Sequence, residues 1–268
     1  MRSIILRHTD IKVSRLSFGT SRLHRLYSSR ARLNVLSAAY EQGITHYDTS
    51  PYYGYGIAEI ELGKFVRSHH SQITISTKFG LYPPFESSIG GFNVLAGKAA
   101  GRFFSDLSNP IVDWSVKRAQ KSLELSLKRL GMECISILML HEPQLNMINS
   151  DDIFSWLMKE KDRGNISAWG LSGNSVSIRP WLGIDHPLDM ILQVSDSIEV
   201  GDADDLRSEG HEPQITFGYI STSFHSNPRP EVGSVIQSAL KKNKNGSVLV
   251  SATSVKHIHE ICAVTEEE

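Results

Sequence analysis

The stretch GITHYDTSPYYG at residues 43–54 decides the fold, because a strand and a polar loop meet inside it. The apolar run from Ile44 to Asp48 predicts a buried strand. Before it, the amphipathic pattern from Arg30 to Gln42 predicts a helix, and Gly43 is a suitable helix stop. After it comes a loop rich in tyrosine. This order of helix, strand and loop is typical of one unit of an alternating α/β fold.

The same alternation continues outward along the chain. Amphipathic patterns at Trp114 to Leu130 and Asp151 to Arg163 predict two further helices. Eight strands alternating with helices favour parallel units that close into a (β/α)8 TIM barrel. The expected strands are Leu16–Thr20, Ile44–Asp48, Ile73–Lys78, Cys134–Leu140, Ser167–Leu171, Met190–Val194, Ile215–Tyr219 and Ser247–Ser251.

A doubly wound sheet is the competing architecture. Its phosphate-binding fingerprint is missing, because Gly54-Tyr55-Gly56 lacks a third glycine. Ahead of the first barrel strand, Ile4 to Val13 predicts an N-terminal β-hairpin around His8-Thr9-Asp10. Without repeats or a linker, residues 1–268 are expected to form a single barrel domain. Only Pro83 to Pro110 is too long for a barrel turn, and we expect an active-site flap or a disordered loop there.

The composition excludes several classes of protein. The chain has 268 residues, 40% of them hydrophobic, and a formal net charge of −1. A chain with this net charge has no broad positive surface potential of the kind that binds nucleic acid or an anionic membrane. No apolar run approaches the roughly 20 residues of a membrane span, and the first residues do not resemble a signal peptide. We therefore expect a cytoplasmic protein, in which Cys134 and Cys262 are reduced.

Four polar side chains mark the carboxyl ends of the predicted strands. Asp48, Lys78 and His141 end the second, third and fourth strands, and Tyr53 lies five residues beyond Asp48. In a barrel the carboxyl ends of all strands face one mouth, so these residues can meet there. Each residue type alone has an ordinary structural explanation, but their joint placement predicts an active site. No spacing of histidines or cysteines typical of a metal site is present, and no metal is expected.

These motifs resemble those of the aldo-keto reductase family, from about Leu6 to about Glu260. The resemblance begins with residues 43–54 and continues through several ordered segments. They are Ala58-Glu59, Leu62-Gly63, Ile75 to Gly80, Ser122-Leu123, Ser126-Leu127, Leu130-Gly131, Leu140 to Pro143, Gly164 to Ser172, and Gln193.

The resemblance implies a catalytic tetrad of Asp48, Tyr53, Lys78 and His141. Hydride addition to a carbonyl leaves an alkoxide that must be protonated, and Tyr53 would be the acid. The nearby ammonium of Lys78 is expected to lower the pKa of Tyr53, and Asp48 to hold Lys78 in place. A hydrogen bond from His141 would orient and polarise the carbonyl.

The resemblance also implies a nicotinamide cofactor, with NADP preferred and NAD possible. Ser172 and Gln193 would hold the carboxamide. Relatives often have Asn directly after this Ser, whereas here Gly173 intervenes before Asn174. An Arg-like position near the last strand holds His257, and Lys256 could meet a 2′-phosphate. The complete set of expected cofactor-binding residues is Gly19, Thr20, Asp48, Ser172, Gln193, Phe217, Thr253, Ser254 and His257.

The function expected from this resemblance is NAD(P)(H)-dependent interconversion of an alcohol and a carbonyl, with an aldehyde, ketone or sugar as the substrate. A non-catalytic or regulatory cofactor-binding barrel subunit is the alternative, and a metal-dependent barrel hydrolase is a weaker one. The protein is expected to be a monomer or a weak homodimer.

Overall fold

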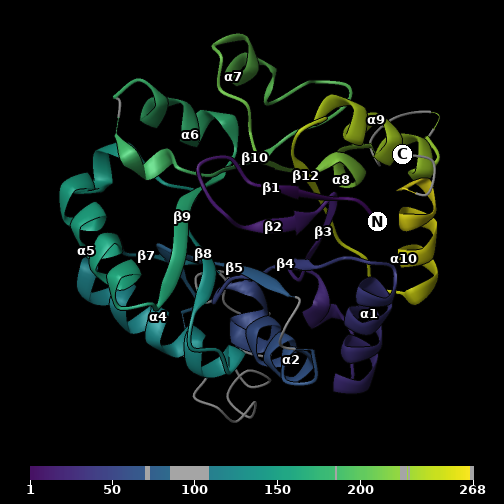
Figure 1. Cartoon of the computed structure of the whole chain (residues 1–268), viewed down its shortest axis with the longest axis horizontal. Coiled ribbons are helices and arrows are strands. Elements are labelled where there is room, and N and C mark those ends of the chain that lie inside the picture. Colours follow the sequence, from purple (N-terminus) through teal and green to yellow (C-terminus); the bar gives the residue numbers. More distant parts are fainter. Residues whose placement is uncertain (70–72, 85–108, 185, 224–227, 229, 266–268) are drawn as a thin grey trace.

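The computed structural model describes residues 1–69, 73–84, 109–184, 186–223, 228 and 230–265. Eight strands, each parallel to its neighbours, close into a barrel (Figure 1). The predicted (β/α)8 barrel is therefore confirmed. In order around the ring the strands are β3 (Leu16–Gly19), β4 (His46–Asp48), β5 (Thr74–Phe79), β8 (Ile135–His141), β9 (Ile166–Gly173), β10 (Leu192–Ser195), β11 (Ile215–Phe217) and β12 (Ser247–Val250).

Helices surround the barrel (Figure 1). Several begin at the polar caps that helix termini need, such as Ser115, whose hydroxyl accepts from the amide of Arg118. The helices are α1 (Ser29–Glu41), α2 (Ile57–Val66), α4 (Val116–Leu130), α5 (Ser150–Asp162), α6 (Ser175–Leu182), α7 (Asp204–Ser208), α8 (Tyr219–Ser223), α9 (Val232–Lys242) and α10 (Val255–Cys262). Short 3-10 turns are η1 (Leu23–Arg25), η2 (Tyr53–Gly56), η4 (Leu145–Met147), η5 (Pro187–Asp189) and η6 (Ala263–Thr265).

The core has two layers, because successive strand residues point to opposite faces. In β8, Ile137 and Met139 belong to the cluster inside the barrel, whereas Leu138 and Leu140 belong to the cluster between strands and helices. The predicted N-terminal hairpin is also confirmed: β1 (Ser3–Ile5) pairs with β2 (Lys12–Ser14). Leu6, which follows β1, and Val13, which lies in β2, belong to the cluster inside the barrel. The hairpin therefore packs on the end of the barrel opposite the carboxyl ends of the strands.

Each predicted strand overlaps an observed one, with ends that differ by at most two residues. The expected strand Ile215 to Tyr219 ends early at Phe217, because Gly218 has a φ of 106° and Tyr219 starts α8. Most of the predicted loop, residues 85–108, lies outside the described residues. The residues that flank the loop pair as a short antiparallel ribbon, β6 (Leu81–Tyr82) with β7 (Ile111–Val112).

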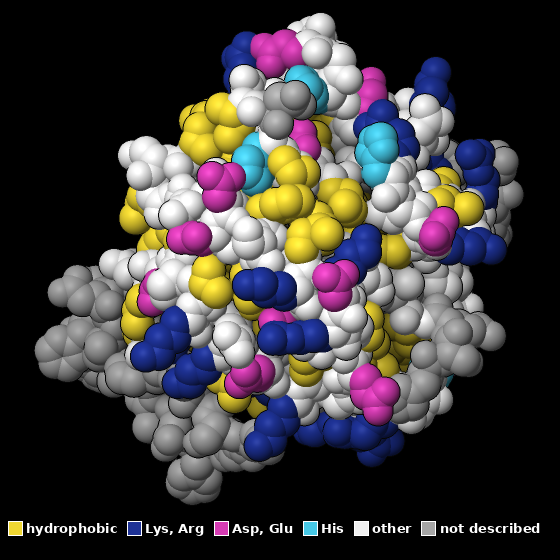
Figure 2. Space-filling model, turned by 60° about the vertical axis from the view of Figure 1, so that its left-hand side comes forward, with side chains coloured by type: hydrophobic (Ala, Val, Ile, Leu, Met, Phe, Trp, Pro, Cys, Tyr) yellow, Lys and Arg dark blue, Asp and Glu magenta, His cyan; other side chains and the backbone are white. Residues whose placement is uncertain are grey.

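The described surface is consistent with a nearly neutral chain. Figure 2 shows Lys and Arg side chains interspersed with Asp and Glu over the face that lies on the left in Figure 1. Cys134 and Cys262 are both free, as predicted. Among the described residues, no helix is long and apolar enough to cross a membrane.

Candidate active site

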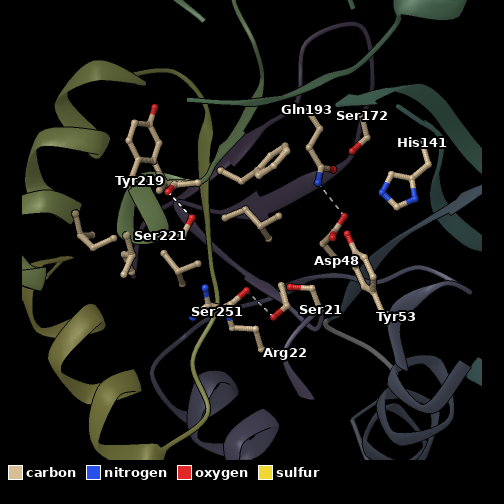
Figure 3. A pocket seen from close by; sticks show the side chains of 18 of the residues that line it. Ser21, Arg22, Asp48, Tyr53, His141, Ser172, Gln193, Tyr219, Ser221 and Ser251 are labelled. Carbon is tan, nitrogen blue, oxygen red and sulfur yellow. Dashed lines mark hydrogen bonds between the residues drawn. The ribbon is translucent and has the colours of Figure 1, made fainter. Parts of the chain in front are cut away.

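A pocket of about 230 Å³ opens at the carboxyl ends of the barrel strands. In Figure 3, Asp48, Tyr53, His141, Ser172 and Gln193 gather at one end of it, which we call the tetrad end. The opposite end, which we call the serine end, is lined by Ser21, Arg22, Ser221 and Ser251. A larger hollow of about 590 Å³ lies beneath the N-terminal hairpin, away from all of these side chains.

Barrel register brings the tetrad together. Asp48 pairs with Ser76 between β4 and β5, and Lys78 is two residues further along β5. His141 ends β8 and pairs with Ser172 of β9. Residues two apart in a strand share a face, so Lys78 lies on the same face of the barrel as Ser76.

A tight turn returns Tyr53 to the mouth. Gly54, Tyr55 and Gly56 all have positive φ values, of 60°, 58° and 89°. A Cβ on Gly54 would lie 2.5 Å from the Cβ of His24, so both conformation and space require glycine there. Between Asp48 and Tyr53 the chain turns at Ser50, whose carbonyl accepts from the Tyr53 amide at 3.0 Å, and the positive-φ residues directly follow Tyr53.

Asp48 and Lys78 form a buried ion pair. The Lys78 Nζ lies 2.6 Å from both carboxylate oxygens and 2.9 Å from the carbonyl of Thr49. The side chains of Ser76 and Gln193 also donate to Asp48 Oδ1, at 2.8 and 3.0 Å. Burial lowers the pKa of Lys78, whereas Asp48 and Tyr53 raise it. Together these two neighbours outweigh burial, so the pKa lies above its ordinary value. Lys78 is therefore charged.

Tyr53 lies beside this pair. The Lys78 Nζ is 4.9 Å from the centre of the tyrosine ring. The sequence led us to expect that Lys78 lowers the pKa of Tyr53, and the ammonium does act in that direction, but the net pKa of Tyr53 is raised. Burial raises the pKa above 10.0 more than the Lys78 ammonium lowers it, and the Asp48 carboxylate adds to the rise. Tyr53 is therefore a protonated hydroxyl near neutral pH.

His141 completes the tetrad end as a neutral imidazole. Its ring centre is 5.9 Å from that of Tyr53, with the two planes at 87°. Burial and the charge of Lys78 hold the pKa of His141 well below 6.5. A neutral ring offers one N–H donor and one acceptor, and Ser50 Oγ lies 3.5 Å from its Nδ1. Such a ring can orient a polar group without adding charge.

The predicted cofactor residues divide into two groups. Gly19, Asp48, Ser172, Gln193 and Phe217 line the pocket. The other residues do not line it. Thr20 is buried behind the wall, where its hydroxyl donates to the carbonyl of Asp48. Thr253, Ser254 and His257 lie at the start of α10, with Ser254 as its cap.

Gln193 provides a test of whether an amide ligand fits. Its Nε2 must be the atom facing Asp48, because a carboxylate only accepts hydrogen bonds. That leaves Oε1 buried and without a hydrogen-bond partner among the described residues. Ser172 pairs with Gln193 in the β9–β10 register and also lines the pocket. An unused acceptor beside a hydroxyl suits a primary carboxamide, which has both N–H donors and a carbonyl.

Sequence reasoning missed several pocket residues. They are Ser21, Arg22, Glu142, Tyr219, Ser221 and Ser251. A positional signal was available for four of the six, which come within two residues of the ends of β3, β8, β11 and β12: Ser21, Glu142, Tyr219 and Ser251. Asn174, which follows Gly173, does not line the pocket; its side chain caps α6 and donates to Glu142. No group of side chains suited to a metal ion occurs in the described part of the chain.

Sequence comparison with known proteins gives evidence that is independent of this geometry. A family model described as the Aldo/keto reductase family matches residues 15–189. The chain is 29% identical to L-galactose dehydrogenase from Arabidopsis thaliana over 215 residues, which are 77% of this chain and 55% of that protein. It is also 29% identical to D-threo-aldose 1-dehydrogenase from a Pseudomonas species over 175 residues, which are 62% of this chain and 52% of that protein. The chain thus spans about half the length of these curated relatives.

The fold is also found among solved structures. An aldo-keto reductase from Bacillus halodurans, determined in its holo form, aligns with a TM-score of 0.75. The alignment covers 99% of this chain and 91% of that one, at 18% sequence identity. This similarity concerns the fold alone.

Proposed function

The chain belongs to the aldo/keto reductase family, and from that premise we propose that it is a nicotinamide-dependent oxidoreductase that interconverts an alcohol and a carbonyl. One observation carries the proposal. A buried Asp48–Lys78 pair lies beside a protonated Tyr53 and a neutral His141, at one end of one pocket. This arrangement supplies a proton donor, a group that orients an oxygen, and a fixed positive charge.

Each tetrad residue has a role that its environment supports. In carbonyl reduction, the Tyr53 hydroxyl donates its proton to the carbonyl oxygen, and in alcohol oxidation the phenolate takes it back. The Lys78 ammonium stabilises that phenolate, and Asp48 keeps Lys78 charged and fixed. The neutral His141 donates a hydrogen bond to the same oxygen and so orients it.

The cofactor supplies or accepts the hydride. Ser172 and the unsatisfied Oε1 of Gln193 would hold its carboxamide, and Phe217 would contact its ring. At the serine end, Arg22 supplies a cation suited to phosphate groups. The hydroxyls of Ser221 and Ser251 donate to the carbonyls of Gly218 and Gly19.

We propose that NADP is preferred, with NAD as a weaker alternative. Lys256 and His257 lie exposed in the first turn of α10, where free backbone amides favour an anion. The only ion pair that the described residues show for Lys256 is a long contact of 3.6 Å with Glu260, on the surface. Such a contact is weak, so Lys256 can turn toward a 2′-phosphate.

The substrate class proposed is a small carbonyl compound or sugar. Two relatives carry names that refer to sugars, L-galactose dehydrogenase and D-threo-aldose 1-dehydrogenase. The described pocket is lined by polar and apolar groups together, which suits a hydroxylated molecule. We propose activity in both directions, because the tetrad serves as acid or base.

A substrate panel tests the proposal directly. The purified chain is mixed with NADPH or NADH and a set of aldehydes, ketones and aldoses, and the absorbance of the reduced nicotinamide is followed. NADP⁺ and NAD⁺ with sugars and alcohols test the reverse direction. We expect turnover with at least one substrate class and a lower Kd for NADPH than for NADH.

Two results would contradict this proposal in different ways. Cofactor binding without turnover of any substrate would favour the non-catalytic cofactor-binding barrel. Tighter binding of NADH than of NADPH would reverse the cofactor preference while leaving the enzyme class intact. Lys256→Ala, compared with Lys244→Ala in the turn after α9, should weaken NADPH binding and leave NADH binding unchanged.

A further inference from the structure

Glu142 occupies an unusual position at the tetrad end of the pocket. It directly follows His141, lines the pocket, and donates its backbone amide to the carbonyl of Ser172 at 2.7 Å. Its φ of 52° lies in the left-handed region, which non-glycine residues rarely adopt. Such a conformation costs free energy and persists only where surrounding contacts hold it.

Those contacts hold the carboxylate itself. Oε2 accepts hydrogen bonds from the Asn174 amide at 3.2 Å, from Asn174 Nδ2 at 2.9 Å and from Ser177 Oγ at 3.1 Å. A Cβ on Gly173 would lie 2.7 Å from the same oxygen, so glycine leaves the space that the carboxylate fills. The sequence around α6 therefore fixes a carboxylate next to Ser172.

This carboxylate has hydrogen bonds but no cation partner among the described residues, unlike the Asp48 carboxylate. Asp48 is neutralised by Lys78 at 2.6 Å, and the low pKa of His141 keeps that ring uncharged. Within the described residues, no ion pair joins Glu142 to a cation. Arg22, the positive side chain that lines the pocket, belongs to the serine end. The pocket is thus negative at one end and positive at the other.

We infer that Glu142 favours the oxidised nicotinamide cofactor over the reduced one, by placing a negative charge near the ring that becomes cationic on oxidation. The inference rests on the proposed function, because it requires the carboxamide to lie at Ser172 and Gln193. Glu142 is tied to Ser172 by a backbone hydrogen bond, so it lies next to that subsite. The two redox forms share their phosphates and adenosine, and they differ by one positive charge on the ring.

The same charge makes the bound reduced cofactor a stronger hydride donor. In carbonyl reduction the hydride carries its electron pair from the ring to the carbonyl carbon, and Tyr53 gives a proton to the oxygen. The carbonyl is reduced and the ring is oxidised. Glu142 undergoes no chemical change, and its carboxylate stabilises the positive charge that appears as the hydride leaves.

The test is the ratio of two dissociation constants. Glu142→Gln keeps the size of the side chain and an oxygen that can accept from Asn174 and Ser177, but removes the charge. The Kd values of NADP⁺ and NADPH are measured by calorimetry in the wild type and the variant, without substrate. We expect the ratio of the oxidised to the reduced Kd to rise about three- to tenfold, as Coulomb's law gives for unit charges roughly 6 Å apart at an effective dielectric constant of about 40 to 80.

A merely structural role would weaken the binding of both forms equally and leave the ratio unchanged. Glu133→Gln is the matched control, because Glu133 is exposed just before β8, at the opposite end of that strand, and should not alter the ratio. Should the variant fail to fold, the wild type gives a second measurement. Glu142 is half-buried, so added salt should screen its charge and raise the same ratio.

An unchanged ratio in Glu142→Gln, or a wild-type ratio that does not depend on salt, would overturn the inference. Either result would leave the proposed function standing as long as both cofactor forms bind. Failure of both forms to bind the wild type would instead contradict the proposed function. The two failures are therefore distinguishable in one set of titrations.

Discussion

At the scale of single residues, protonation states decide what the tetrad can do. Tyr53 is half-buried, and its pKa lies above the ordinary value of 10.0 because desolvation outweighs the attraction of Lys78. His141 has a pKa well below 6.5, owing to burial and to the same ammonium. In the proposed reaction, the proton that reaches a carbonyl oxygen near neutral pH would therefore come from Tyr53, and His141 would contribute a hydrogen bond only.

This assignment predicts the pH dependence of carbonyl reduction. Tyr53 must be protonated, and its raised pKa keeps it so, hence kcat/KM should stay level from about pH 6 to about pH 9 and fall above 10.0. Alcohol oxidation needs the phenolate and should increase with pH over the same range. Initial rates in both directions check this expectation. A fall in reduction centred near pH 6.5 would mean that a protonated histidine takes part.

The convergence of the four tetrad residues could be predicted from sequence, whereas the net direction of the Tyr53 pKa could not. Asp48, Lys78 and His141 stand at strand ends, and the parallel topology makes strand ends converge. The direction of the Tyr53 pKa depends on how completely the η2 turn buries the ring, and that is a tertiary property. The position of Arg22 in the pocket wall could not be predicted, because nothing in its local sequence distinguishes it from a solvated arginine.

At the scale of elements, one buried carboxylate joins the segments beside the pocket. Asp196 follows β10 and accepts from Arg207 of α7 at 2.7 Å, from Tyr219 of α8 at 2.8 Å and from Lys242 of α9 at 3.2 Å. The Asp196 side chain is fully buried. Tyr219 also lines the pocket, so this network fixes part of the pocket wall.

Removing that charge should destabilise the fold. Asp196→Asn removes a charged acceptor shared by Arg207 and Lys242. Because both cations keep Asp204, at 2.6 and 3.1 Å, we expect a loss of about 1.5–3 kcal/mol. Tyr219→Phe removes one hydrogen bond and should cost about 1 kcal/mol. The free energies of unfolding from urea titration compare the two variants. Equal losses would show that the Asp196 charge does not organise these elements.

Some short elements could not be predicted from the sequence, and the Asp196 network explains two of them. Long barrel strands and α4 carry strong apolar patterns, so their positions follow from sequence alone. The short helices α7 and α8 have five residues each and are held by Asp196 rather than by periodicity. The β6–β7 ribbon has only two residues per strand, too few for an alternating pattern to be recognised.

At the scale of the whole molecule, the barrel gathers one pocket from strands spread over the chain. Residues from β3 to β12 line it, and the N-terminal hairpin packs against the opposite end of the barrel. Alternating strands and helices suffice to predict this architecture. The division of the pocket into a tetrad end and a serine end does not follow from the pattern, because it depends on which loop side chains turn inward.

In the proposed function, Tyr53 acts as the acid and base of a nicotinamide-dependent reaction. The most direct measurement compares turnover and cofactor affinity in the wild type, Tyr53→Phe and Tyr55→Phe, with the best substrate of the panel. Tyr55 belongs to the same turn but does not line the pocket. We predict that Tyr53→Phe lowers kcat about 10²–10⁴-fold while the Kd of NADPH stays within about threefold, and that Tyr55→Phe retains turnover. Turnover by Tyr53→Phe at the wild-type rate would contradict the claim.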